Sequence, residues 1–165
     1  LCSCACAYAF GGETAQAALA FAVLGILTVV ALMDMDTLEI YDRFPALLFV
    51  CGIAAHILIP SLGIKSRLIG CVIVSVPMLL LALIVPGGFG GGDIKLAGAT
   101  GLVLGLPASL TASCLGLTGF VMYGCMVCLW NRFKGKRDKE AFPVGPFLAG
   151  GAAAVYCMRL GGWMI

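Results

Sequence analysis

Long apolar stretches alternate with short polar breaks along almost the whole chain. A helix needs roughly 20 apolar residues to cross a hydrocarbon core of about 30 Å, and most of the apolar stretches come close to that length. They predict six membrane-spanning helices, at residues 15–33, 45–64, 68–85, 94–106, 108–130 and 143–161. The pattern therefore indicates an all-α polytopic membrane protein, with one domain over residues 1–165 and a six-helix core over residues 15–161.

Composition supports the same fold class and narrows the partners. Of the 165 residues, 62% are hydrophobic and 11% are charged, whereas about a quarter of the residues in a typical globular domain are charged. This length leaves no room for a separate soluble domain beside six spans. The net charge of +2 is small and no basic surface is evident, so we expect contact with membrane lipid and no nucleic-acid partner.

Residues near the ends of the predicted helices suggest local structure. Residues 1–14 form an apolar stub and a polar break, and without a basic start or a clear cleavage site they are not expected to be a signal peptide. Lys65, Ser66 and Arg67 predict a charged turn between the second and third helices. Pro77 is expected to kink the third helix. Small residues in the fourth and sixth helices should permit close packing, namely Gly98, Gly101, Gly105 and residues 149–154.

Lys and Arg residues in short loops indicate which side of the membrane is cytoplasmic. The loop at residues 131–142 holds five of them, and placing it inside also brings the loops at residues 34–43 and 87–93 to that side. Seven of the ten Lys and Arg residues then lie inside. We therefore expect a multi-pass protein of the inner (cytoplasmic) membrane, with Asp34 and Asp93 at the cytoplasmic face.

Asp34 and Asp93 are the candidate catalytic residues. Asp34 closes the first predicted helix, and Asp93 follows a glycine-rich run that begins at Gly87. When two carboxyl groups share a site, their repulsion raises one pKa, so one group stays protonated while the other is ionised. The ionised group can take a proton from water while the protonated group polarises a peptide carbonyl. This chemistry is aspartyl proteolysis with no metal or organic cofactor, and because the pair titrates as a unit, the identity of the base stays open.

Three motifs in the same order resemble a known family. The first runs from Asp34 to Asp42, the second is Gly90-Gly91-Gly92-Asp93 followed by Ile94 and Lys95, and the third contains Pro143, Gly145 and Pro146. Together they resemble the type IV prepilin peptidases and the related preflagellin peptidases, which are membrane aspartyl proteases of the Gly-x-Gly-Asp type. Tyr41 stands where the family usually has proline.

The resemblance implies a membrane endopeptidase that removes the short basic leader from prepilin or pseudopilin precursors of type IV pili or type II secretion, at the cytoplasmic face. Asp34 and Asp93 would be catalytic. Other matched positions would bind substrate or shape the loops: Gly90, Gly91, Gly92, Lys95, Asp36, Glu39, Asp42, Pro143, Gly145 and Pro146. Many bacterial members also methylate the new N-terminus and carry two Cys-x-x-Cys pairs ahead of the first aspartate. The 33 residues ahead of Asp34 hold no such loop, so the question of methylation stays open.

Several assignments have alternatives. Presenilin-like proteases pair a Tyr-Asp with Gly-x-Gly-Asp, which would make Asp42 catalytic in place of Asp34. Asp36, Glu39 and Asp42 form either a solvated loop or a surface that attracts a basic leader. Lys95 either pairs with an aspartate or extends its amine to the membrane interface. From another class of function, the two acids could carry protons or cations in a small transporter or channel subunit.

His56 and the cysteines have plainer interpretations. His56 lies deep in the second predicted helix without visible partner ligands, so we expect a packing residue rather than a metal ligand. Cys125 and Cys128 form a single Cys-x-x-Cys inside an apolar helix, where a second pair is missing. A structural zinc site normally needs four such ligands, so we expect no metal site.

Overall fold

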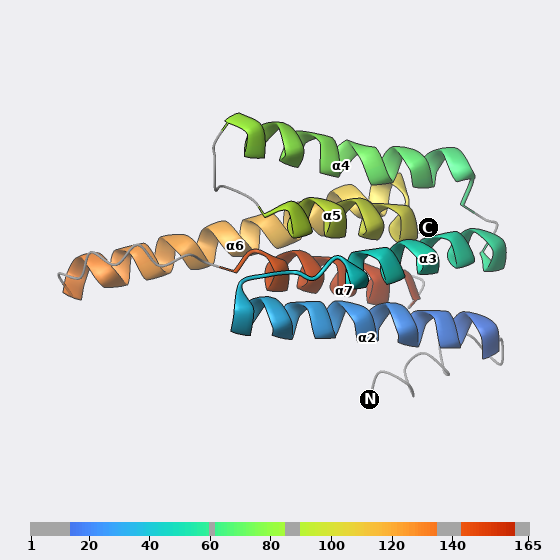
Figure 1. Ribbon diagram of the computed structural model, residues 1–165, viewed down its shortest axis with the longest axis horizontal. Coiled ribbons are helices and arrows are strands. Elements are labelled where there is room, and N and C mark those ends of the chain that lie inside the picture. The colour runs from blue at the N-terminus through green and yellow to red at the C-terminus, as the bar shows by residue number, and fades with distance from the viewer. Residues whose placement is uncertain (1–13, 60–61, 85–89, 135–142, 161–165) are drawn as a thin grey trace.

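The computed structural model describes residues 14–59, 62–84, 90–134 and 143–160, and these residues form an all-α bundle (Figure 1). The helices are α2 (Thr14–Thr37), α3 (Arg43–Leu58), α4 (Ile64–Ile84), α5 (Gly91–Leu104), α6 (Leu106–Lys134) and α7 (Gly145–Leu160). Each predicted helix therefore has a counterpart, and the prediction of an all-α membrane protein is confirmed.

The helices differ in length, and this decides which of them can cross a membrane alone. Three are long and apolar enough by length and composition, namely 15–37 in α2, α4 and α6. Helix α3 is a shorter apolar helix. Helix α5 has only 14 residues, which corresponds to about 21 Å at 1.5 Å per residue. It packs against α3, α4, α6 and α7, so its short backbone is enclosed by protein.

Glycines let α4 and α5, and α6 and α7, approach closely. A methyl group added to Gly101 of α5 would overlap the carbonyl oxygen of Gly70 in α4, and one added to Gly151 of α7 would overlap the carbonyl oxygen of Ala112 in α6. Membrane helices associate largely through such close backbone packing. The expected close packing of the fourth and sixth predicted helices is thus confirmed at these positions.

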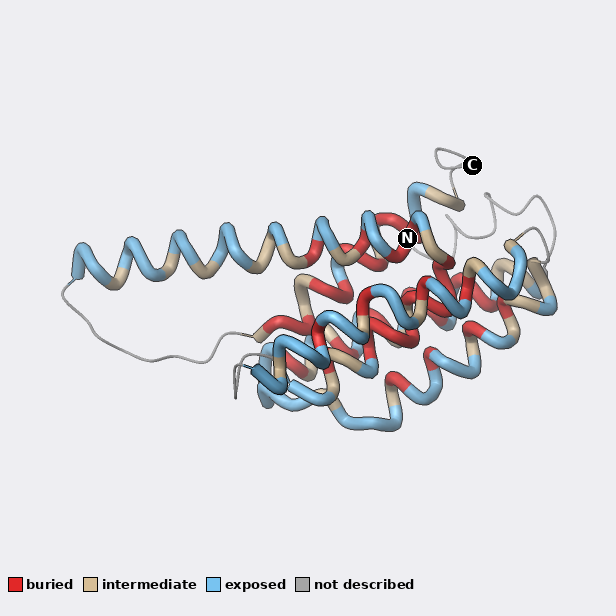
Figure 2. Tube along the Cα trace, turned by 90° about the horizontal axis from the view of Figure 1, so that it is seen from above, coloured by how far each residue is buried: buried red, intermediate tan, exposed pale blue. Residues whose placement is uncertain are grey.

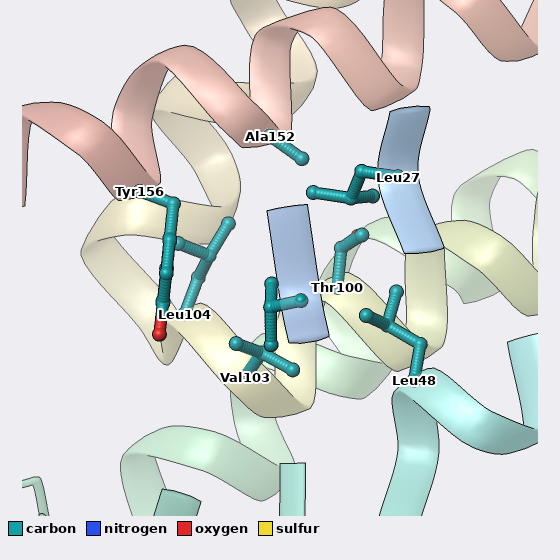
Figure 3. Close-up of a pocket in the computed structure, with 8 residues that line it drawn as sticks. Leu27, Leu48, Thr100, Val103, Leu104, Ala152 and Tyr156 are labelled. Carbon is teal, nitrogen blue, oxygen red and sulfur yellow. The ribbon is translucent and has the colours of Figure 1, made fainter. Parts of the chain in front are cut away.

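The middle of the bundle is filled by side chains. Figure 3 shows residues of α2, α3, α5 and α7 converging around a void of about 10 Å³, roughly the space of one water molecule. The residues around the void are mainly aliphatic: Val23, Leu27, Leu48, Thr100, Val103, Leu104, Ala152 and Tyr156. This core fixes the relative positions of the helices that carry the candidate carboxylates.

The predicted charged turn at Lys65 to Arg67 is wrong. Helix α4 begins at Ile64, and Arg67 is only 1% exposed. One guanidinium nitrogen of Arg67 donates to the carbonyl oxygens of Leu102 (3.1 Å) and Val103 (2.9 Å) in α5. The other donates to two carbonyl oxygens at the end of α3. The last carbonyls of a helix have no partner within that helix, and Arg67 supplies donors to two helix ends at once.

Other helix boundaries also differ from those predicted from the sequence. Helix α2 continues through Asp34 to Thr37, so Asp34 lies in the last turn rather than at the end. Pro77 lies inside α4, which runs through it as one helix. Pro107 falls in the first turn of α6, where its missing N–H costs no helical hydrogen bond. The predicted stub at 1–14 and most of the basic loop at 131–142 fall outside the described residues.

Candidate active site

The side chain of Asp34, in the last turn of α2, is bound by the backbone at the start of α7. Asp34 is 5% exposed, and its Oδ2 accepts a hydrogen bond from the backbone N–H of Gly145 at 2.9 Å. The free N–H groups at a helix N-terminus stabilise negative charge. A methyl group on Gly145 would lie 2.8 Å from Oδ2 of Asp34. The approach of Asp34 to the third motif therefore depends on glycine at position 145.

Asp93 lies in the first turn of α5 and is 7% exposed. Its Oδ2 accepts a hydrogen bond from the backbone N–H of Gly90 at 3.2 Å, which is one half of a capping box. Its Oδ1 is buried and has no hydrogen-bond partner among the described residues. An unpaired buried acceptor is costly, so this oxygen is the natural place for a shared proton or a water molecule.

The two carboxyl groups influence each other. Asp93 lies outside the three long apolar helices, and burial raises its pKa from 3.8 to about 6, against the opposing effect of the Gly90 hydrogen bond. The negative charge of Asp34 raises the pKa of Asp93 further. The two aspartates therefore lie close enough for the charge of one to influence the other, and their role as a catalytic pair stays a prediction.

The glycine turn also packs on the loop that follows α2. A methyl group on Gly92 would lie 2.7 Å from Cβ of Ile40 and 3.0 Å from its carbonyl oxygen. Leu38 begins that loop with a φ of 54°, which is rare for a residue with a side chain. Its N–H donates to the carbonyl oxygen of Asp34 at 3.0 Å. Sequence reasoning missed Leu38 and Ile40, because neither carries a chemical group that marks a site.

Lys95 pairs with Asp42 across the same two segments. Its Nζ lies 2.7 Å from both carboxylate oxygens of Asp42, and the side chains are 55% and 71% exposed. The alternative in which Lys95 pairs with an aspartate is confirmed. An exposed ion pair of this kind contributes about 0–1 kcal/mol. Asp42 is therefore a surface partner of Lys95, whereas Asp34 is the buried carboxylate that acts on Asp93.

The remaining predicted positions surround this centre at different depths. Asp36, Glu39, Gly90 and Gly91 are exposed, while Pro143 and Pro146 are half-buried at the start of α7. A groove of about 500 Å³ lies between α3, α4 and α5 and includes Asp42 and Lys95 but neither Asp34 nor Asp93. The described part of the chain contains no group of three or more His, Cys, Asp or Glu residues that could hold a metal ion.

The comparisons with known proteins agree with the motifs. The model of the type IV leader peptidase family matches residues 21–130. The chain is also 27% identical over 133 residues to the "Prepilin leader peptidase/N-methyltransferase" of Bacillus subtilis (strain 168), which covers 81% of this chain and 52% of that protein. The chain thus spans about half the length of this curated relative. No solved structure matches the chain. Since the family model covers well over half of the chain, the chain belongs to the type IV leader peptidase family.

Proposed function

We propose that the protein is a membrane aspartyl endopeptidase that cleaves the leader peptide from prepilin-like precursors, with Asp34 and Asp93 as its catalytic pair. The observation that carries this proposal is that two buried carboxylates from distant parts of the chain lie close enough for the charge of Asp34 to raise the pKa of Asp93. Each has one oxygen held by a backbone N–H, from Gly145 and Gly90 respectively. The other oxygens are the ones that can face water and substrate.

In this mechanism the reactive form has Asp93 protonated and Asp34 ionised, and burial and the charge of Asp34 both favour that form by raising the pKa of Asp93. Asp34 takes a proton from a water molecule, whose oxygen attacks the scissile carbonyl carbon. Asp93 donates its proton to the carbonyl oxygen as the tetrahedral intermediate forms. The intermediate then collapses, the proton on Asp34 passes to the leaving nitrogen, the C–N bond breaks, and Asp93 recovers its proton from the new hydroxyl group.

Charged side chains around the pair suit a basic leader peptide. Asp36 in the last turn of α2 and Glu39 in the loop after it are both exposed, and complementary charge favours encounter with a cationic segment. Gly91 is exposed and a methyl group added there would meet nothing within 4 Å, which leaves space for an extended substrate backbone beside Asp93. The matched relative carries the words "prepilin leader peptidase" in its name, which supports precursor proteins of this kind as substrates.

The basic end of α6 supports an active site on the cytoplasmic side of the inner membrane. Arg132 and Lys134 lie in its last turn, and basic residues next to a span favour the cytoplasm. Helix α6 ends toward the same side of the bundle on which α5 and α7 begin (Figure 1). The proposed pair of carboxylates therefore faces the compartment in which leader peptides are synthesised.

The test is cleavage of a purified prepilin with a Lys-rich leader by the protein in liposomes. Asp34→Asn and Asp93→Asn keep size and hydrogen-bonding capacity, and each should lower the rate by at least 1,000-fold, on the order of 4 kcal/mol of transition-state stabilisation. Asp36→Asn is the matched control: it removes an exposed carboxylate that would only help to attract the leader, so cleavage should fall by no more than about tenfold. If both catalytic-position variants still cleave, the proposal is wrong; proton flux through wild-type liposomes without any cleavage would favour a transporter.

A further inference from the structure

The helices that carry the two aspartates are joined mainly through other elements. Helix α2 carries Asp34 in its last turn, and α5 carries Asp93 in its first turn. Each of them packs on α3 and on α7, but in the described part of the chain they do not form one of the substantial helix–helix contacts with each other (Figure 1). Direct packing of α2 on α5 therefore does not set the distance between the two carboxyl groups.

The loop that follows α2 touches α5 just before and just after Asp93 in the sequence. A methyl group on Gly92 would lie 2.7 Å from Cβ of Ile40 and 3.0 Å from its carbonyl oxygen, so the two residues are in close contact. Beyond Asp93, Nζ of Lys95 lies 2.7 Å from both carboxylate oxygens of Asp42. This loop therefore links the end of α2 directly to the turn that carries Asp93.

Ile40 is the residue that anchors this loop in the protein. Buried residues gather in the middle of the bundle (Figure 2), and among residues 35–42 Ile40 alone is not exposed. Its side chain packs against the hydrophobic core. The ion pair of Lys95 and Asp42 is exposed and contributes little. The contact of Ile40 is therefore the one that can hold the loop on the glycine turn.

The other end of the loop is fixed to the last turn of α2. The N–H of Leu38 donates to the carbonyl oxygen of Asp34 at 3.0 Å, and Leu38 has a φ of 54°. This is the left-handed ending that helices usually make with glycine. The hydroxyl group of Thr37 accepts from the N–H of Glu39 at 3.3 Å and lies 2.9 Å from the carbonyl oxygen of Met33, to which it can donate. Backbone strain of this kind persists where the surroundings hold it, and it is common at active sites.

We propose that residues 37–40 form a spacer that fixes Asp93 relative to Asp34, with Thr37 and Ile40 as positioning residues. Thr37 sets the direction in which the chain leaves α2, and Ile40 passes that position on to the turn before Asp93. A displacement of about 1 Å between reacting groups can lower a rate about 100-fold. This inference rests on the proposed function, because it concerns the catalytic pair of that peptidase.

The hydroxyl group of Thr37 can be removed without changing the shape of the side chain. In the liposome assay of prepilin cleavage, Thr37→Val should lower kcat at least about fivefold while KM stays within about twofold. Thr37→Ser keeps the hydroxyl group and should restore kcat to within about twofold of the wild type. Thr111→Val also loses a hydroxyl bonded to its own helix backbone and should cleave like the wild type. Unchanged kcat in Thr37→Val, or a Thr37→Ser variant that is equally slow, would overturn the spacer.

The contact of Ile40 can be measured without cleavage, through the environment of Asp93. Burial raises the pKa of Asp93 to about 6, and Asp34 is the charged group that acts on it. On the same helix, Lys95 turns its amine to Asp42. Asp93→Asn should therefore raise the Tm in detergent more at pH 8 than at pH 4, because the fold favours the protonated carboxyl group.

In an Ile40→Ala background this difference between the two pH values should fall by at least about half, because a released turn leaves Asp93 more hydrated. Ile57→Ala removes the same atoms at a position that is 74% exposed, and it should keep the full difference. Ile40→Ala should also lower kcat at least about fivefold. An undiminished difference or an unchanged kcat in Ile40→Ala would overturn the role of Ile40.

Failure of the spacer and failure of the proposed function give different results. If the wild type does not cleave a prepilin, the peptidase proposal is wrong, while the Tm comparison still reports the contact of Ile40. If the wild type cleaves and Thr37→Val and Ile40→Ala cleave equally fast, the peptidase proposal holds and the spacer is wrong.

Discussion

The backbone N–H of Gly145 donates to Oδ2 of Asp34 at 2.9 Å, which joins the first residue of α7 to a carboxylate 111 positions earlier in the chain. This contact links the first and third family motifs in space. It also shows why the third motif needs glycine, since the position of a methyl group there is already occupied by the carboxylate.

Gly145→Ala should therefore abolish most of the activity without unfolding the protein. The new methyl group would lie 2.8 to 3.0 Å from three atoms of the Asp34 side chain and displace the carboxylate. We expect a fall in kcat/KM of at least 100-fold, on the order of 3 kcal/mol. Gly150→Ala in the same helix is the control, since nothing lies within 4 Å of the added methyl. Equal cleavage by both variants would contradict this role of Gly145.

Asp93 should make stability depend on pH. Its folded pKa of about 6 lies above its ordinary value of 3.8, so the fold favours the protonated form. Stability is then greatest below about pH 4 and declines as pH rises through about 6. Asp93→Asn, which cannot ionise, should raise the Tm measured in detergent at pH 8. The gain in free energy of unfolding should be at most about 3 kcal/mol, and it should disappear near pH 4. A gain that does not vary with pH would contradict the raised pKa; Asp36→Asn is the exposed control.

Arg67 should be essential for stability although it is far from the carboxylates. Arg67→Met keeps the apolar stem but removes the donor to four carbonyl oxygens at the ends of α3 and α5, of which only that of Ala55 keeps a backbone donor, the N–H of Ile59, in the described part of the chain. Each buried polar group that loses its partner costs at most about 1–3 kcal/mol, and the costs of neighbouring groups do not simply add. We expect a loss of about 3 kcal/mol or more in unfolding free energy. Arg132→Met at the exposed end of α6 should change stability by less than about 0.5 kcal/mol.

The crossing of α4 and α5 should tolerate no side chain at Gly101. Gly101→Ala would force the methyl group into the backbone of Gly70, and overpacking of this kind costs about 1–3 kcal/mol. Gly25→Ala, in open space on α2, should instead be neutral or stabilising by up to about 1 kcal/mol. Thermal unfolding in detergent compares the two; a Gly101→Ala variant as stable as Gly25→Ala would show that the helices can separate easily.

The ion pair of Lys95 and Asp42 should matter little for stability or cleavage. Both side chains are more than half exposed, so a double-mutant cycle with Lys95→Met and Asp42→Asn should give a coupling below about 1 kcal/mol. Asp42→Asn should also retain cleavage within about tenfold, on the order of 1.4 kcal/mol. Complete loss of cleavage in Asp42→Asn, with Asp34→Asn active, would instead make Asp42 the catalytic residue.

The helices and the placement of two carboxylates near their ends could be predicted because both follow from local sequence patterns. Apolar runs of sufficient length define spans, and Asp34 and Asp93 stand out against them. Arg67 was missed because a charged residue in a short polar stretch resembles a solvated turn. Its partners Leu102 and Val103 lie 35 and 36 positions away, and no local pattern reveals that pairing.

The hydrogen bonds at the C-terminal end of α5 limit how this helix can move. Arg67 and Arg159 together hold the carbonyl oxygens of its last three residues, and Gly105 then turns the chain into α6 with a φ of 77°. Sliding α5 along its axis would break all of these contacts, whereas tilting it about this anchored end preserves them. Helix α5 is thus anchored at its C-terminal end, and any tilt would be largest at the glycine end that carries Asp93.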